Sequence, residues 1–484
     1  SSDVLVAIFQ VVPAQRLFLI NELLSNIDKL PFKRVQRTLN KISKDKYATY
    51  FTTCLLTLLA NINSFEVLSH QEGTTDDTIA LFKREKKEQE KLASDFIEHI
   101  NQTILKRFLQ NSTKYRYILE SFVQDLVILF RLPTWFIASE VLSSLLNKLL
   151  SIFESSSTSS LVETSCLQIV GQIGSAIFDV KHSTLSKQDN NIVKLYNYPE
   201  YIPQFLESFN RCIEYTRMDP TGLSSYEYIQ CKEFEKLLEL YELNSDVNNI
   251  SNIDTYMKEF LTKVTDLKSI IKGGISFEDI NNDFCSVLQS EVLISQYESY
   301  FHILLTMLDS NKIKLKSTAI KALSLLVSKD NTILSNPILK SAISQILIDD
   351  SAASVRDAVL DLIGIGSGYM QYYKQININF DDDSILVRKH ILKINEQIYS
   401  ESEDIETNIF VASRILLKTE DEEDAIIDSA KKTLLNKWIL SFDDRNQRDE
   451  SEMNIIKKTI SVIAGVISLD RKNFEVFDWF LNFY

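Results

Sequence analysis

Histidine and cysteine, the side chains that most often carry catalysis or bind metals, are few and scattered in this 484-residue chain. There are five of each, and no two stand at the spacing of HExxH, CxxC or another ligand motif. The sequence also lacks a GxSxG nucleophile motif, a Walker A loop and a kinase HRD motif. We therefore expect no catalytic residue, no metal site and no cofactor, and we expect the chain not to be an enzyme. The cysteines are expected to be buried, reduced thiols.

Clusters of basic residues offer a different chemistry, the neutralisation of phosphate. One tract follows Pro31, which predicts the start of a helix, and two others begin near Lys316 and Arg388. Spaced cations along a helical surface suit the DNA backbone, where binding is electrostatic and independent of sequence. The alternative, which the sequence leaves open, is a set of independent, solvated side chains. The residues that we predict to contact DNA are Lys33, Arg34, Arg37, Lys316, Ser317, Lys321, Arg388, Lys389 and His390.

The composition favours helices as the elements that position these residues. Only 10 glycines and 7 prolines occur, which argues against strand-and-turn folds and Gly-rich loops. The net charge of −14 gives no support of its own to nucleic-acid binding, so the local distribution of charge matters more than the average. No run of about 18 apolar residues occurs, so no membrane span is expected.

Three segments between residues 308 and 395 share one pattern. Each has an acidic turn, then an apolar residue, a basic residue and an amphipathic helix. The basic positions are Lys316, Arg356 and Arg388, and a fourth copy is expected at 427–430. A period near 40 residues with two helices per unit is typical of HEAT and armadillo repeats. Since turn aspartates and the following arginines bond across neighbouring repeats in such arrays, we expect Arg356 to be structural.

These observations predict an all-α fold, a HEAT-repeat α-solenoid that is elongated and curved. We place an N-terminal helical segment at 1–192 and a central HEAT-repeat solenoid at 193–484.

The sequence resembles the cohesin loader subunits of the Nipped-B/adherin family, in their central HEAT-repeat region. The resemblance is strongest in SVRDAVLDLIG at 354–364, in the tyrosine pair 372–373 and in SILVRKHILKI at 384–394. It extends through EDEE at 420–423 to Trp438. Weaker similarity lies further back, for example in FVQDL and LPTW between residues 122 and 135.

The resemblance implies a DNA-binding scaffold that loads cohesin onto chromatin. Such a scaffold holds double-stranded DNA against the ATPase heads of the cohesin SMC subunits and stimulates their ATP hydrolysis. It also implies the kleisin subunit as a partner, and a TPR-repeat loader partner bound through a region that we expect to lie outside this chain. The expected location is the nucleus, on chromatin. His390 departs from the family's pattern, since a second basic residue is common there.

The main alternative function is that of a nuclear transport receptor, another class of acidic HEAT-repeat protein. A transport receptor should have an acidic inner face for basic cargo, whereas a loader should have a basic stripe that joins Lys316 and Lys321 to Lys389.

Overall fold

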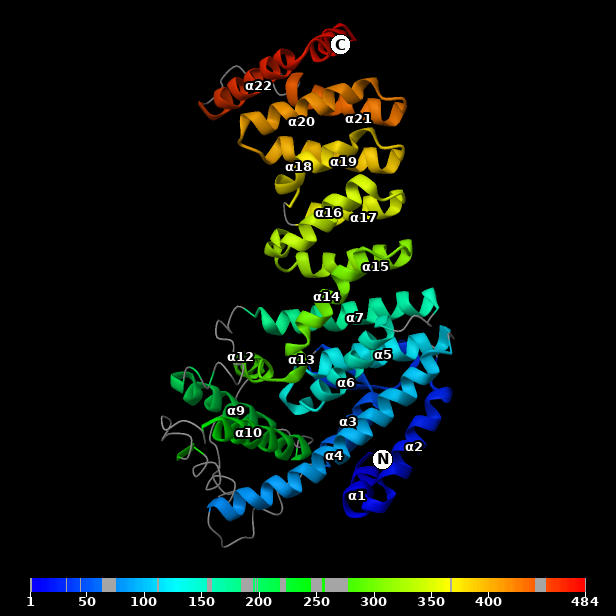
Figure 1. Ribbon diagram of the computed structural model, residues 1–484, viewed down its shortest axis with the longest axis vertical. Coiled ribbons are helices and arrows are strands. Elements are labelled where there is room, and N and C mark those ends of the chain that lie inside the picture. Colours follow the sequence, from blue (N-terminus) through cyan, green and yellow to red (C-terminus); the bar gives the residue numbers. More distant parts are fainter. Residues whose placement is uncertain are drawn as a thin grey trace. The chain divides into compact units, whose positions relative to one another are not determined.

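The structure is a computed structural model in which most of the chain is described (Figure 1). The described residues are 2–31, 33–43, 45–62, 75–110, 113–154, 159–183, 195, 197, 199–217, 223–244, 255–256, 277–365, 368–439 and 450–483. They form two compact units, Ser1–His302 and Ile303–Tyr484.

Unit 1 is built from helices and one short hairpin. Its elements are α1 (Ser2–Val11), α2 (Arg16–Ser25), β1 (Leu39–Ser43), β2 (Lys46–Thr49), α3 (Tyr50–Ala60), α4 (Thr75–Phe108), α5 (Thr113–Leu129), α6 (Ala138–Glu154), α7 (Ser160–Lys181), α9 (Ile202–Arg217), α10 (Leu223–Asn244), α12 (Phe277–Leu288), α13 (Val292–Ser295) and the start of α14 (Tyr297–Leu308). Helices α5, α6 and α7 pack against one another at the centre. The apolar residues of α6 recur every three or four positions, and this face is buried.

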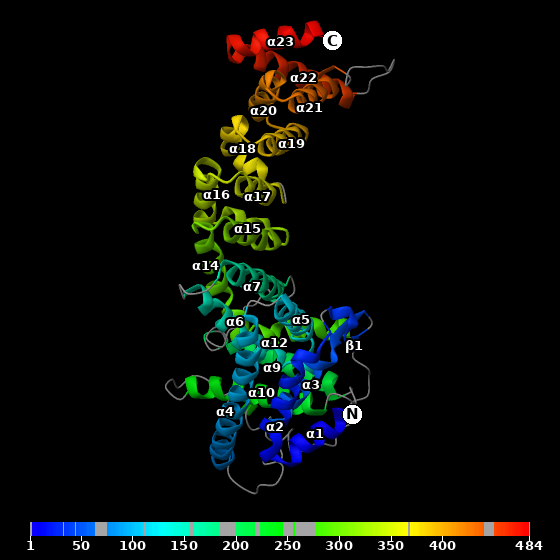
Figure 2. The ribbon, with the colours of Figure 1, turned by 90° about the vertical axis from the view of Figure 1, so that its right-hand side faces the viewer.

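Unit 2 consists of helices that alternate between two sides. They are α15 (Ile313–Val327), α16 (Pro337–Asp349), α17 (Ala353–Gly364), α18 (Tyr369–Ile378), α19 (Ile385–Glu401), α20 (Ile405–Leu417), α21 (Asp424–Leu434), α22 (Glu450–Leu469) and α23 (Arg471–Phe483). Figure 2 shows α16, α18 and α20 along one side of this unit and α15, α17, α19 and α21 along the other. We call the second set the B helices. Each packs on the next, as stacked helix pairs require.

The two compact units divide at residues 302–303, whereas the domain boundary predicted at residue 192 stays a prediction. Helices α9 and α10 pack on the short helical turn Pro133–Trp135, and α13 packs on α6 and α7. Residues beyond 192 therefore belong to unit 1, because their apolar faces are covered by earlier helices. Periodicity within the sequence could not reveal these long-range contacts.

The helix predicted to start at Pro31 does not form. Leu30 is extended, and only the short turn Arg34–Gln36 is helical before the antiparallel strands β1 and β2. A tertiary contact explains the difference, since the Arg34 side chain donates to the carbonyl of Tyr47 in β2 and to Asp125 in α5. Apart from this hairpin, the described elements are helical, and the all-α HEAT fold is confirmed. The elongation and curvature of the solenoid stay predictions.

Among the residues that the structure describes, one helix is long and apolar enough to span a membrane. It is α7, whose most apolar window has a mean hydropathy of 1.3, but 72% of that window is buried against the rest of unit 1. The segments Val4–Val11 and Pro13–Lys29 pass the same test only if they are counted as one span, although they are bent by 117°. Burial of α7 among the other helices of unit 1 is the behaviour of a core helix.

Candidate nucleic-acid interface

Each B helix from α15 to α21 begins three residues after a polar turn residue. These residues are Ser310, Asp350, Asp382 and Asp421. Each side chain accepts a hydrogen bond from the backbone N–H two residues later, for example Ser384 N to Asp382 Oδ1 at 2.8 Å. This local bond satisfies one of the backbone donors that a helix start leaves unpaired. Before α17, α19 and α21 an aspartate closes the turn, and before α15 Ser310 does.

The basic residue six positions after each turn residue bonds to the turn aspartate of the next repeat. Lys316 Nζ lies 2.6 Å from Asp350 Oδ2, and Arg388 Nη2 lies 3.2 Å from Asp421 Oδ1. Arg356 makes a two-pronged contact with Asp382, with Nε to Oδ2 at 2.6 Å and Nη2 to Oδ1 at 2.7 Å. We call this series of ion pairs the inter-repeat ladder.

Two ladder arginines also bond within their own repeat. Arg356 Nη1 donates to the carbonyl oxygen of Asp350, and Arg388 Nη1 donates to that of Asp382, both at 2.5 Å. Each guanidinium therefore joins its own turn to the next one. The predicted structural role of Arg356 is confirmed.

The electrostatics of the ladder lower the pKa values of two of its carboxylates, Asp382 and Asp421. Burial alone would raise the pKa of Asp382, but hydrogen bonds from Arg356 and from the backbone of Ser384 outweigh it and lower this pKa. The same balance lowers the pKa of Asp421, where Lys418 donates at 2.9 Å. The hydrogen bonds that Arg356 donates to Asp382 in turn raise the pKa of Arg356. Each ladder contact is thus a pair of opposite charges largely shielded from water.

The fourth copy of the repeat is one residue out of its predicted register. Counted from the turn residue, buried Val387 in α19 corresponds to Ile426 and not to Ile427. The ladder position Arg388 then corresponds to Ile427, which has no charge. The ladder therefore ends at Asp421.

The ladder changes the interpretation of two predicted DNA contacts. Lys316 and Arg388 already neutralise buried aspartates, and Arg388 is itself buried. A side chain held in this way is not available to phosphate without loss of the inter-repeat bond.

Arg34 and Arg37 of the N-terminal tract are also held within the fold. Arg34 Nη2 lies 2.6 Å from Asp125 Oδ1, and Asp125 is 0% exposed. The other oxygen of Asp125 accepts from Thr49 N at 3.0 Å and from Thr52 Oγ1 at 2.8 Å. Arg37 is 9% exposed and donates to the carbonyl of Pro31. These bonds fix the hairpin onto α5, and of the three predicted residues in this tract only Lys33 is fully exposed.

Exposed lysines remain on the B helices at equivalent positions. Lys389 lies seven residues after its turn residue, and Lys321, Lys393 and Lys432 each lie eleven after theirs. None of the four forms an ion pair with a residue in the described part of the chain. Lys432 lies outside the predicted site, although the count of eleven from Asp421 would have found it.

The basic surface is interrupted on α17. Asp357 and Asp361 stand at the seventh and eleventh positions of that repeat, between the lysines of α15 and those of α19. Asp357 Oδ1 is 2.8 Å from His390 Nδ1, and both side chains are partly exposed. Ser317, at the seventh position of the first repeat, is half-buried. The lysines therefore form separate groups and not the continuous stripe that we expected.

Metal and thiol chemistry find no support in the described ranges. No group of three or more His, Cys, Asp or Glu side chains there could hold a metal ion. The five cysteines are buried and unpaired, and burial raises the pKa of Cys212 well above its ordinary value. The prediction that they are buried is confirmed, and their reduced state stays a prediction.

Comparison with known proteins agrees with the repeat analysis. A sequence profile of the HEAT repeat associated with sister chromatid cohesion matches residues 321–363. The chain is 42% identical to Sister chromatid cohesion protein 2 of Saccharomyces cerevisiae, over 100% of this chain and 33% of the yeast protein. Nipped-B-like protein of Homo sapiens is 25% identical over 98% of this chain and 18% of its own length. The chain thus spans a third or less of the length of these relatives.

A solved structure has the same fold. The C-terminal fragment of the Chaetomium thermophilum cohesin loader SCC2 superposes with a TM-score of 0.73 at 17% sequence identity, over 99% of this chain and 39% of the fragment. The identity along the whole chain, together with the HEAT profile, carries the assignment of family. The chain belongs to the SCC2/Nipped-B family and corresponds to its C-terminal HEAT region.

Proposed function

We propose that this chain is a scaffold that binds double-stranded DNA and holds it against the ATPase heads of cohesin, whose ATP hydrolysis it stimulates. The proposal rests mainly on the 42% identity to yeast Sister chromatid cohesion protein 2 along the whole chain. The family is one of non-catalytic scaffolds, so the hydrolysis belongs to the partner. Its place of action is chromatin in the nucleus, and the kleisin subunit is a further partner.

The exposed lysines of the B helices support DNA as a ligand. Lys321, Lys389, Lys393 and Lys432 carry charges that no described ion pair neutralises, and each is exposed. Cations that recur at the eleventh position of α15, α19 and α21, with Lys389 beside them on α19, match a polyanion better than a compact ligand. Ser317 adds a hydroxyl that can donate to a phosphate oxygen near Lys321. Lys33 is a separate, exposed cation on unit 1.

ATP hydrolysis by purified cohesin tests this function. The rate should rise when the chain and duplex DNA are both added, and the chain alone should hydrolyse no ATP. Replacement of the four B-helix lysines by glutamine should reduce the DNA-dependent part of the rise. The matched control is Lys374→Gln, an exposed lysine on α18 on the opposite side of unit 2. No rise with the unmodified chain, or the same loss in the control, would contradict the proposal.

A further inference from the structure

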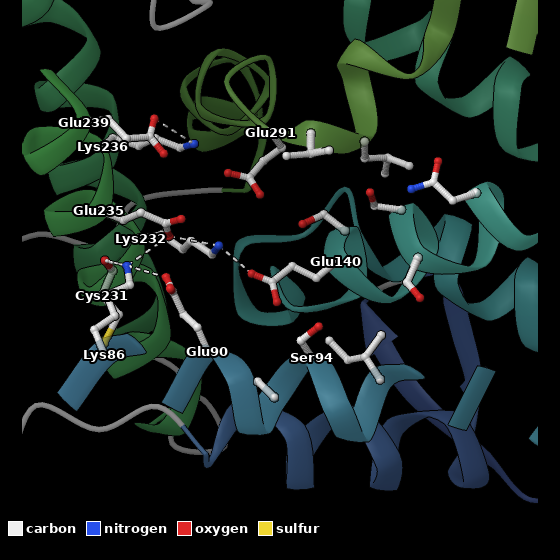
Figure 3. Close-up of a pocket in the computed structure, with 18 residues that line it drawn as sticks. Lys86, Glu90, Ser94, Glu140, Cys231, Lys232, Glu235, Lys236, Glu239 and Glu291 are labelled. Atoms are coloured by element: carbon white, nitrogen blue, oxygen red, sulfur yellow. Dashed lines mark hydrogen bonds and ion pairs between the residues drawn. The ribbon is translucent and has the colours of Figure 1, made fainter. Parts of the chain in front are cut away.

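Unit 1 contains a cavity of about 430 Å³ between α4, α6, α10 and α13 (Figure 3). This volume lies in the range of about 300–1,000 Å³ that ligand pockets occupy. Its wall carries five glutamates and three lysines, so two negative charges are left over if all are ionised. Neither the family assignment nor the DNA proposal uses this cavity.

The three lysines of the wall already have acidic partners. Lys232 Nζ lies 2.5 Å from Glu140 and 3.0 Å from Glu235. Lys86 Nζ lies 3.0 Å from Glu235 and 3.4 Å from Glu90. The third, Lys236, is 3.6 Å from its neighbour Glu239 on α10. Because each of these lysines is already paired, the wall is poorly suited to an anionic ligand.

Glu291 has a buried oxygen without a hydrogen-bond donor, although the charges of Lys232 and Lys236 act on its carboxylate. It is 6% exposed, and its Oε1 has no hydrogen bond. The residue stands directly before α13 but does not cap that helix with its side chain. Figure 3 shows its carboxylate directed into the cavity, toward the side occupied by Lys232 and Glu140. A buried acceptor with no donor costs free energy, and a ligand that brings donors would remove this cost.

The chemistry of the wall selects an organic cation. No set of three or more ligating side chains in the described ranges could hold a metal ion, Glu291 and its neighbours included. A lysine that entered beside Lys232 and Lys236 would lose its charge easily under burial and repulsion. An arginine stays protonated, is less strongly hydrated, and presents several donors in one plane.

We propose that this cavity is a binding site for an arginine side chain of a partner protein, held through its guanidinium by the carboxylate of Glu291. The small polar side chains Ser94 and Asn147, exposed at the wall, leave room for the backbone that carries the arginine. Protons compete with the ligand for Glu291. Since burial raises the pKa of this carboxyl, arginine binding should weaken as the pH falls, beginning above the ordinary range of glutamate.

Saturation-transfer NMR on the whole chain tests this site with three small probes. They are N-acetyl-arginine-amide, N-acetyl-lysine-amide and N-acetyl-citrulline-amide, the last of which keeps the shape of arginine without its charge. The arginine probe should bind more tightly than the other two. Equal signals from the arginine and citrulline probes, or none from the arginine probe, would overturn the proposal.

Three variants locate the binding. Glu291→Gln should weaken the binding of the arginine probe by about tenfold or more, because the substitution removes one charge-assisted hydrogen bond. Glu239→Gln is the matched control at the rim, where the side chain is 42% exposed, and should change binding by less than about twofold. Ser94→Arg, at an exposed position of α4, should block the probe by supplying a guanidinium from the chain itself. Since this third variant leaves Glu291 intact, it decides the question if Glu291→Gln does not fold. Probe binding that survives Ser94→Arg would rule the cavity out.

Discussion

Arg356 of α17 donates two hydrogen bonds, of 2.6 and 2.7 Å, to Asp382, the turn residue of the next repeat. The same guanidinium bonds to the carbonyl of Asp350 in its own turn. One side chain thus sets the distance between two consecutive turns. Since these ion pairs join each repeat of unit 2 to the next, substitutions that remove them should lower the free energy of unfolding.

Asp382→Asn should destabilise the chain by about 1–3 kcal/mol, because it leaves the largely buried Arg356 guanidinium without its anion. Asp382 is 5% exposed as a side chain, whereas its neighbour Asp383 is exposed. Asp383→Asn is therefore the matched control and should change the free energy of unfolding by less than about 0.5 kcal/mol. Urea denaturation measures both. Equal values for the two variants would contradict the structural role of the ladder.

The contribution of Asp382 to the free energy of unfolding should also depend on pH. Its pKa is lowered in the folded chain, so the stabilisation is present above the unfolded value of about 3.9 and is lost as the pH falls through the folded value. The difference in stability between wild type and Asp382→Asn should accordingly shrink in acid. Denaturation curves at several pH values below 5 would show it, and a constant difference would speak against ionic pairing.

Asp125→Ala should be among the most damaging substitutions in unit 1. It removes the acceptor for Arg34, Thr49 and Thr52 and leaves a partly buried guanidinium unpaired. The expected cost is about 3 kcal/mol or more. Gln124→Ala, an exposed neighbour on the same helix, is the control and should cost little. Thermal unfolding compares the two, and a similar melting temperature would mean that the hairpin is not fixed by Asp125.

Two glycines in helices should respond oppositely to alanine. A Cβ at Gly174 in α7 would overlap the ring of Tyr300, which is itself buried, so Gly174→Ala should destabilise by about 1–3 kcal/mol. At Gly364 in α17 nothing lies within 4 Å of the added carbon. There the usual preference of helices for alanine should apply, with a gain of up to about 1 kcal/mol. Unfolding that shows no difference between the two would contradict the packing around Tyr300.

The repeat pattern predicted the fold because it is local. Turn, apolar residue and basic residue recur with each helix pair, and the role of Arg356 follows from that recurrence. Lys316 and Arg388 occupy the same position, so the same reasoning assigns them to the ladder as well. The contact of Arg34 with Asp125 joins residues 91 positions apart, and Glu291 meets α10 only through the folding of unit 1. No spacing within the sequence reveals such tertiary partners.

The salt dependence of DNA binding tests the central claim most directly. Fluorescence anisotropy with duplex DNA should show a linear fall of log affinity with log salt concentration. The double variant Lys389→Gln, Lys393→Gln should bind all sequences more weakly and lower the slope by about 0.9 for each lost contact. Lys374→Gln, an exposed lysine on α18, serves as the control. An unchanged affinity and slope in the double variant would contradict DNA binding on the B helices.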